Sequence, residues 1–352
     1  MNRYIDSHKL HFHPQRVAQW DAADEWEKAK EVYPIYVEIS PVGACNHRCT
    51  FCAVDYIGYR STQLDGAILR RRLGEMASLG VKSVMFAGEG EPLLHKETNV
   101  TVLAGFHGGL DMAFTTNGVL LHKLREIGLC KWVRISLNAG TAETYAKVHR
   151  TKKEDFTTVW RNIEDAVKRK GTCDLGVQTV ILPENVKEIE KLYRLCDEAG
   201  VDYLIAKPYS QHKKSITRDY EAVKPWDDFL QFKSEPGHCE FIYRAETDQT
   251  TEIPYDRCHA TPNFWAYIMA SGDVYSCSAY LLDERFKMGN INEHTFKNVW
   301  QSEKRRVNWE FVRRDLGAGG LDIHECRVNC RMHRVNLYLN EMREMEFDKS
   351  FI

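Results

Sequence analysis

The sequence contains no run of apolar residues long enough to cross a membrane, which would take about 20. Its first residues, from Met1 to His8, lack the apolar stretch of a secretory signal peptide. Neither sign of charge is in excess, because 48 Lys and Arg stand against 50 Asp and Glu and both are mixed along the chain. We therefore expect a cytoplasmic protein that binds neither nucleic acid nor a membrane surface by charge.

Low-complexity tracts and exact internal repeats are also missing, and the 43% apolar and 28% charged residues are typical of a globular protein. A chain of 352 residues suffices for one large domain and a smaller one. It contains 11 cysteines. Disulfides are rare in a reducing compartment, so clustered cysteines there indicate metal ligands.

Apolar, β-rich runs alternate with segments of helical spacing. The predicted strands are Tyr36–Ile39, Ser83–Phe86, Asp111–Thr116, Trp132–Leu137, Leu175–Leu182 and Tyr203–Lys207. Helical spacing is clearest in Ala67–Leu79 and Val186–Ala199. This alternation predicts a parallel sheet with right-handed crossovers, hence an α/β fold with a partial (β/α)6 TIM-like barrel. Periodicity alone leaves a doubly wound open sheet as the rival.

Changes in composition divide the chain into five parts. A small cysteine-rich α+β domain is expected after the barrel, because the strand–helix alternation stops near Lys207 and residues 211–257 are charged and irregular. The predicted parts are a helical preamble at 1–34, the barrel at 35–210, a connecting segment at 211–257, the cysteine-rich domain at 258–340 and a tail at 341–352.

Three cysteines, Cys45, Cys49 and Cys52, follow the first predicted strand with the spacing C-x3-C-x2-C. In a barrel the loops at the C-terminal ends of the strands form the functional face. Three thiolates hold three irons of a 4Fe–4S cluster and leave the fourth iron open to a ligand. A zinc site or three buried thiols are the alternatives.

This spacing, with Phe51 before the last cysteine, resembles the signature of the radical S-adenosylmethionine (SAM) superfamily. The resemblance implies that SAM chelates the open iron and is cleaved reductively to a 5′-deoxyadenosyl radical. It also places Phe51 near the adenine. The segment Gly88-Glu89-Gly90-Glu91 resembles the family's Gly-Gly-Glu motif, whose backbone binds the methionine amino group, with Glu89 in place of the first glycine.

Polar residues at the ends of later strands are further candidates for cofactor binding. By resemblance, Ser136 or Asn138 binds the ribose and Arg150 reaches the SAM carboxylate, while capping of strands and helices is the alternative role. Asn117 ends the third strand, and Gln178 is expected to face the barrel interior. After the sixth strand, Lys207, Tyr209 and Gln211 are candidates for substrate binding, against a plain solvated loop.

Four further cysteines, Cys258, Cys277, Cys326 and Cys330, form a second set. A predicted β-hairpin turns at Ser271-Gly272-Asp273 between the first two. The pattern resembles the auxiliary-cluster domain of the SPASM/twitch subgroup, and four cysteines imply the shorter twitch form with one auxiliary 4Fe–4S cluster. Structural zinc bound by four cysteines is the alternative.

The resemblance implies a radical SAM enzyme with two cofactor types, SAM and 4Fe–4S clusters, and a reductant such as flavodoxin or ferredoxin as partner. An auxiliary cluster beside the substrate favours oxidation, so we expect an oxidoreductase or epimerase acting on a polar small molecule, such as a sugar or cyclitol derivative. A peptide-modifying maturase and a non-catalytic electron carrier are the alternatives. The sequence identifies no catalytic acid or base.

Overall fold

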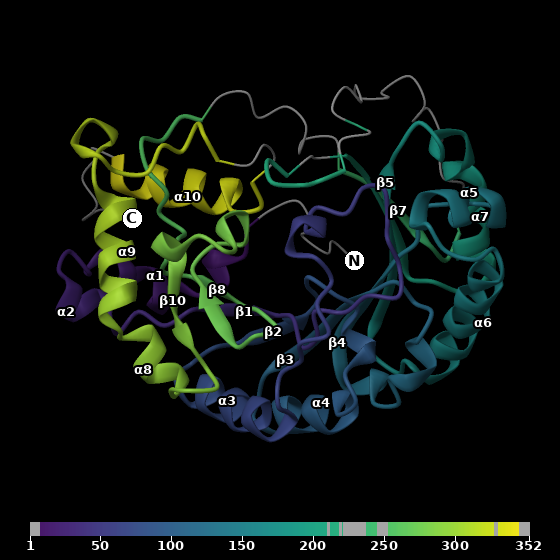
Figure 1. Cartoon of the computed structure of the whole chain (residues 1–352), viewed down its shortest axis with the longest axis horizontal. Coiled ribbons are helices and arrows are strands. Elements are labelled where there is room, and N and C mark those ends of the chain that lie inside the picture. Colours follow the sequence, from purple (N-terminus) through teal and green to yellow (C-terminus); the bar gives the residue numbers. More distant parts are fainter. Residues whose placement is uncertain are drawn as a thin grey trace.

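The computed structural model describes residues 8–209, 212–217, 220, 237–244, 253–326 and 330–344. In these residues one sheet of ten strands has the order β10-β9-β8-β1-β2-β3-β4-β5-β6-β7 (Figure 1). The strands are β1 (Tyr36–Ile39), β2 (Ser83–Phe86), β3 (Asp111–Thr116), β4 (Cys130–Ser136), β5 (Asp174–Ile181), β6 (Tyr203–Pro208), β7 (Glu240–Tyr243), β8 (Trp265–Ile268), β9 (Asp273–Tyr275) and β10 (Lys287–Asn290).

Strands β1 to β7 are all parallel and lie side by side in chain order. A doubly wound sheet reverses its strand order at a switch point, whereas a barrel adds each new strand on the same side. The order therefore decides for the barrel and against the rival.

Helices cover the outer side of the curved sheet, as Figure 1 shows for α3, α4 and α6. The helices are α1 (Pro14–Asp21), α2 (Trp26–Ala29), α3 (Gly66–Ser78), α4 (Thr98–His107), α5 (Ala142–His149), α6 (Glu154–Arg169), α7 (Ile189–Glu198), α8 (Phe296–Trp300), α9 (Glu303–Arg313) and α10 (His333–Glu344). In α6, buried residues recur at positions 159, 162, 163 and 166, the spacing of one helix face. No described helix is long and apolar enough to span a membrane.

Every second residue of a barrel strand points to the helices. Val37 and Ile39 of β1, and Val133 and Ile135 of β4, are fully buried in the main core with the outer helices. Their neighbours along the strands therefore lie on the opposite, inner face of the sheet. That inner face includes Glu38, a charged residue that is only 5% exposed.

The first three strands have the predicted bounds, and β4, β5 and β6 differ from prediction by one or two residues. The prediction of an irregular segment over residues 211–257 was wrong in one place, because β7 (Glu240–Tyr243) lies there and pairs with β6. Four residues without flanking helical periodicity carry too little pattern to be recognised as a strand.

The predicted hairpin of the cysteine-rich segment is confirmed, with β8 and β9 antiparallel around Gly272 (φ 87°). Its first strand also pairs in parallel with β1, Tyr267 lying opposite Glu38. The hairpin thus extends the barrel sheet beyond β1. A second core gathers on the hairpin side, where Trp265, Tyr267 and Tyr275 pack near the cysteines.

Candidate functional site: two cysteine centres facing one sheet

The loop after β1 carries Cys45, Cys49 and Cys52, each of them half-buried. It packs against the loop after β2, where the backbone N–H of Glu91 donates to the carbonyl of Ala44 at 2.9 Å. A Cβ on Gly90 would lie 2.3 Å from the carbonyl oxygen of Val42 and 2.4 Å from that of Ala44. Only glycine fits this close approach, so the glycine-rich segment holds the cysteine loop in place.

The thiols of this loop fit a metal cluster. Burial raises the pKa of Cys45 to about 11 and that of Cys49 well above its ordinary value, and the neighbouring thiols add to both shifts. Buried thiolates that face one another repel, and a bound cationic centre removes this penalty. The three residues therefore suit an iron–sulfur cluster with one iron left open.

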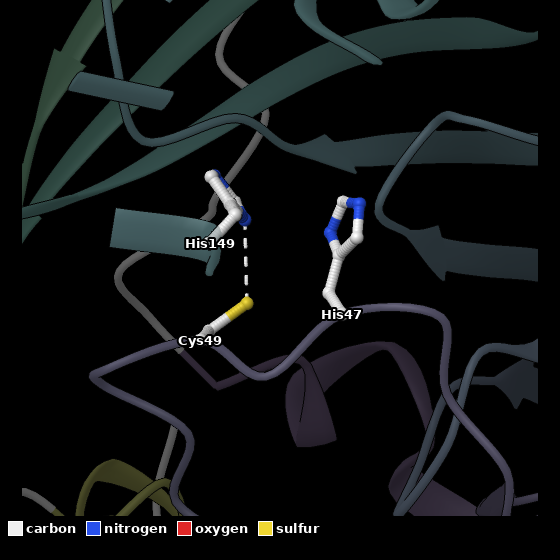
Figure 2. Close-up of side chains that lie close together, drawn as sticks. All are labelled: His47, Cys49 and His149. Atoms are coloured by element: carbon white, nitrogen blue, oxygen red, sulfur yellow. Dashed lines mark hydrogen bonds between the residues drawn. The ribbon is translucent and has the colours of Figure 1, made fainter. Parts of the chain in front are cut away.

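A histidine that the sequence analysis did not select contacts this loop. His149, the last residue of α5, lies with Nδ1 at 3.3 Å from the sulfur of Cys49 (Figure 2). The backbone N–H of Asn138 donates to its Nε2 at 3.2 Å. Because Nε2 accepts that bond, the proton of the neutral ring is on Nδ1, which donates to the cysteine sulfur.

His47, inside the cysteine motif, lies beside this pair, and its ring is 5.3 Å from that of His149. Potential ligand atoms of His47, Cys49 and His149 all lie within 4.8 Å of one another (Figure 2). Burial lowers the pKa of His47 to about 4, so its ring is neutral at physiological pH. The sequence feature that could have identified these histidines as site residues was their position: His47 stands within the cysteine motif, and His149 directly precedes Arg150.

Glu91 joins the loops that follow β2 and β3. It is 2% exposed, and its carboxylate accepts from Thr116 Oγ1 at 2.6 Å and from the backbone N–H of Asn117 at 2.8 Å. The side chain of Asn117 in turn donates to Asn46 at 2.7 Å. This chain of bonds fixes the cysteine loop to the ends of two strands.

Glu89 points to the hairpin. One carboxylate oxygen accepts from the backbone N–H of Ala270 at 3.0 Å, and the other is buried without a hydrogen-bond partner among the described residues. Burial raises the pKa of Glu89 to about 7, against the opposing effects of the Ala270 bond and of Arg60. The residue that replaces a glycine of the family motif thus joins the barrel to the cysteine-rich segment.

Glu89 gives the stability of the protein a pH dependence of definite sign. Because its pKa rises from 4.5 to about 7 on folding, its contribution is complete below pH 4.5 and is lost as the pH rises through 7. Glu89→Gln keeps an acceptor for Ala270 and does not titrate. Between pH 4.5 and 7 the wild type should lose about 3 kcal/mol of free energy of unfolding that the variant keeps.

Urea unfolding at a series of pH values measures this difference, with exposed Glu164→Gln as the matched control. The wild type and the control should show the same pH slope. An equal slope for Glu89→Gln would contradict the prediction.

The remaining cofactor candidates surround the cysteine loop. Phe51 packs edge-on to His149 at 5.7 Å, and Arg150 caps α5 with φ 48° at a position that favours the thiolate form of Cys49. Ser136 ends β4 on the inner face, opposite Gln178 of β5. Asn138 is 1% exposed, and its side-chain oxygen accepts from the backbone N–H of Val180 at 2.6 Å.

The substrate candidates lie at the end of β6. Lys207 is half-buried within the strand, and the ring of Tyr209 lies 5.3 Å from that of Tyr220. Gln211 lies outside the described residues. Next to it, residues 212–217 cover the cysteine loop, where Ser215 donates to the carbonyl of Cys52 at 3.0 Å.

The second set of cysteines also converges. Burial raises the pKa of Cys330 to about 11 and that of Cys277 well above its ordinary value, and charges on the other thiols of the set add to both. Tyr280 OH lies 3.0 Å from the sulfur of Cys326, and Asn336 donates to the sulfur of Cys258 at 3.5 Å. These polar contacts at two sulfurs suit thiolates.

Arg331, which follows Cys330, connects this centre to the barrel. Its guanidinium pairs with Glu38 on the inner face of β1 and lies 5.4 Å from the ring of Trp265. Tyr36 donates to the same carboxylate at 3.3 Å. Both cysteine centres thus border the inner face of the sheet.

Comparison with known proteins agrees with this geometry. A family model for the radical SAM superfamily matches residues 39–196, which include the three-cysteine loop. A model for an iron-sulfur cluster-binding domain, SPASM, matches residues 258–331 and begins at Cys258. Residues 39–196 belong to the radical SAM superfamily. This radical SAM protein is an enzyme whose cofactors are SAM, the 4Fe–4S cluster that binds it, and auxiliary iron–sulfur.

Relatives of this radical SAM enzyme act on different molecules. The AdoMet-dependent heme synthase of Methanosarcina barkeri is 24% identical over 287 residues, which cover 73% of this chain and 79% of that protein. The GTP 3′,8-cyclase of Chlorobaculum tepidum is 30% identical over 187 residues, which cover 51% of this chain and 55% of the cyclase. The chain thus spans about half the length of this cyclase.

Among solved structures, SuiB of Streptococcus suis bound to S-adenosylmethionine superposes with a TM-score of 0.64 at 16% identity, covering 96% of this chain and 79% of SuiB. Native anSMEcpe with bound AdoMet gives a TM-score of 0.57 at 19% identity, covering 86% of this chain and 88% of that one. At these identities the likeness shows the shared fold of radical SAM enzymes.

Proposed function

We propose that this enzyme abstracts a hydrogen atom from a polar small molecule held against the inner face of the sheet, and that the outcome is an oxidation or an epimerisation. A sugar or cyclitol derivative is the first substrate class to test. When bound, SAM and its cluster supply the 5′-deoxyadenosyl radical, and the protein supplies orientation. A flavodoxin or ferredoxin is the proposed reductant.

The observation that carries this proposal is the pairing of Arg331 with Glu38. It supports an arrangement in which the auxiliary centre borders the same inner face as the cysteine loop after β1. An auxiliary cluster at that place provides an electron acceptor beside the substrate, which favours a two-electron oxidation. The inner face is polar there, since it carries Glu38, Arg134 and Gln178.

The proposed SAM site follows from the placement of the candidates. Backbone groups of residues 88–91 and the side chain of Asn117 lie beside the cysteine loop, as do Phe51 and Arg150. Ser136 is the better ribose candidate, because the side-chain oxygen of Asn138 is already bonded to Val180. The proposed catalytic unit spans residues 35–210 and the auxiliary-cluster unit 258–340.

Deuterium transfer tests this function. The protein is purified without oxygen, its clusters are reconstituted, and it is incubated with SAM, a strong reductant and perdeuterated polar metabolites. We expect deuterium to appear in 5′-deoxyadenosine together with a mass or stereochemical change in one metabolite. Variants that lack a cysteine of the loop after β1 are the control, because they should form no 5′-deoxyadenosyl radical.

Peptide modification is the competing function, supported by the likeness to SuiB, whose structure with the precursor peptide SuiA has a TM-score of 0.62. Short peptides encoded near the gene for this enzyme belong in the same assay. Deuterium transfer from a peptide, with no change in any metabolite, would overturn the small-molecule proposal.

A further inference from the structure

Arg134 places a positive charge on the inner face of the barrel. In β4, Val133 and Ile135 are fully buried toward the helices, so Arg134 points the other way, between Trp132 and Ser136. Its neighbours across the sheet are Thr115 of β3 and Gly176 of β5. A charged residue at the middle of a parallel sheet calls for a partner.

The guanidinium of Arg134 is not paired with a carboxylate in the described ranges of the chain. It lies 4.7 Å from the ring of Trp132 and 5.9 Å from that of Tyr203, and its Nη1 donates to Gln178 Oε1 at 3.5 Å. Its Nε is buried and has no hydrogen-bond partner within the described part of the chain. No carboxylate of the described residues comes within 4.0 Å of its nitrogens.

Two other arginines of the described residues have partners for their guanidinium groups. Arg331 pairs with Glu38. Arg305 is 0% exposed, and its guanidinium donates to the carbonyls of Pro262, Ala29 and Trp300. These arginines serve the structure. Arg134 differs because its buried Nε has no hydrogen-bond partner among the described residues and the bond from its Nη1 to Gln178 is long, at 3.5 Å.

The surroundings select the chemistry of that ligand. The planar fork of a guanidinium matches a carboxylate with two parallel hydrogen bonds. The rings of Trp132 and Tyr203 flank it, and Met85 and Ala113 form a small apolar cluster with Trp132 on the same face. Flat apolar walls around a planar cation favour an organic carboxylate over a tetrahedral phosphate.

We propose that Arg134, assisted by Gln178, binds a carboxylate of the substrate. This assignment rests on the proposed function and narrows its substrate to a carboxylate-bearing molecule. Arg134 lies two residues before Ser136, so it is roughly 7 Å further from the strand end where the SAM candidates gather. A substrate anchored there directs its other end toward the cysteine loop.

Binding of a small probe tests the proposal without turnover. Para-fluorobenzoate is titrated by fluorine NMR into the reconstituted enzyme with SAM bound and no reductant added. We expect Arg134→Gln to weaken its binding by about 10- to 100-fold, the loss typical of a charge-assisted hydrogen bond, and Arg134→Lys to weaken it less. Arg71→Gln, which removes an exposed positive charge on α3, is the matched control and should bind as the wild type does.

Three further measurements distinguish a substrate carboxylate from other occupants of this position. Neutral para-fluorobenzamide should not bind; equal binding of the amide and the acid would overturn the proposal. Competition by inorganic phosphate that depends on Arg134, stronger than by benzoate, would overturn the carboxylate assignment. SAM itself carries a carboxylate, so a similar loss of SAM affinity in Arg134→Gln would reassign the arginine to the cofactor and overturn it too.

The proposed function and the proposed anion site can each be overturned without the other. The probe experiment reads binding alone, and the deuterium experiment reads the radical reaction alone. Loss of probe binding in Arg134→Gln with deuterium transfer from peptides only would support the anion site and overturn the small-molecule substrate. Unchanged probe binding in Arg134→Gln, with deuterium transfer from a metabolite, would overturn the anion site and support the small-molecule substrate.

Discussion

Cys49→Ala is expected to abolish formation of 5′-deoxyadenosine from SAM. Cys49 is the middle ligand of the three-cysteine loop, and its sulfur also receives the hydrogen bond from His149. Loss of outer-shell partners already costs metal sites about 10- to 100-fold, so loss of a ligand should cost more. Bound iron should fall from about eight to about four atoms per chain. Mass spectrometry of the nucleoside and iron analysis measure both effects.

Cys196→Ala provides the control for this variant. Cys196 is a cysteine of α7 that is fully buried in the main core, where a free cysteine acts as a small apolar side chain. Its replacement should leave the iron content and SAM cleavage as in the wild type. Production of 5′-deoxyadenosine by Cys49→Ala would contradict the assignment of the loop.

Cys277→Ala is expected to remove the auxiliary cluster and leave the SAM-binding cluster in place. Cys277 is half-buried, and the other three auxiliary cysteines lie close enough to raise the pKa of its thiol. Its loss should therefore remove the auxiliary cluster and lower bound iron from about eight to about four. The loop after β1 keeps its three cysteines, so SAM should still be cleaved. Conversion of the substrate should fall by at least about 10-fold, because the auxiliary centre borders the proposed substrate face.

Electron paramagnetic resonance of the reduced protein distinguishes the clusters. Addition of SAM should change the whole spectrum of Cys277→Ala, since the cluster that remains is the one with an open iron. A zinc atom in the wild type, removed in this variant with no change in iron, would contradict the assignment of the auxiliary centre.

Local pattern predicted much of this structure. Strands β1 to β3 have the predicted bounds because short β-rich runs between turn residues are recognisable within a few positions. The spacing of Cys45, Cys49 and Cys52 indicated the chemistry of the first centre, since three ligands on one tight loop need no distant partner. The turn at Gly272 was likewise a local signal.

Local sequence pattern did not predict the contacts between segments that are distant in the chain. The strand β7 has four residues and is defined by pairing with β6. The pairing of β8 with β1 joins residues more than two hundred positions apart, as does the ion pair between Arg331 and Glu38. Sequence periodicity does not specify which strand becomes whose neighbour.

The sequence by itself indicated the radical SAM superfamily through the resemblance of its first cysteine motif, because Cys45, Cys49 and Cys52 lie in one short stretch. It also predicted the second set, whose four cysteines are spread from residue 258 to residue 330. Tertiary structure alone decided that both centres border one face of the sheet and that His149 donates to Cys49. It also decided that the buried Nε of Arg134 has no hydrogen-bond partner among the described residues. Burial and hydrogen bonding arise where segments pack, so such properties belong to the folded chain.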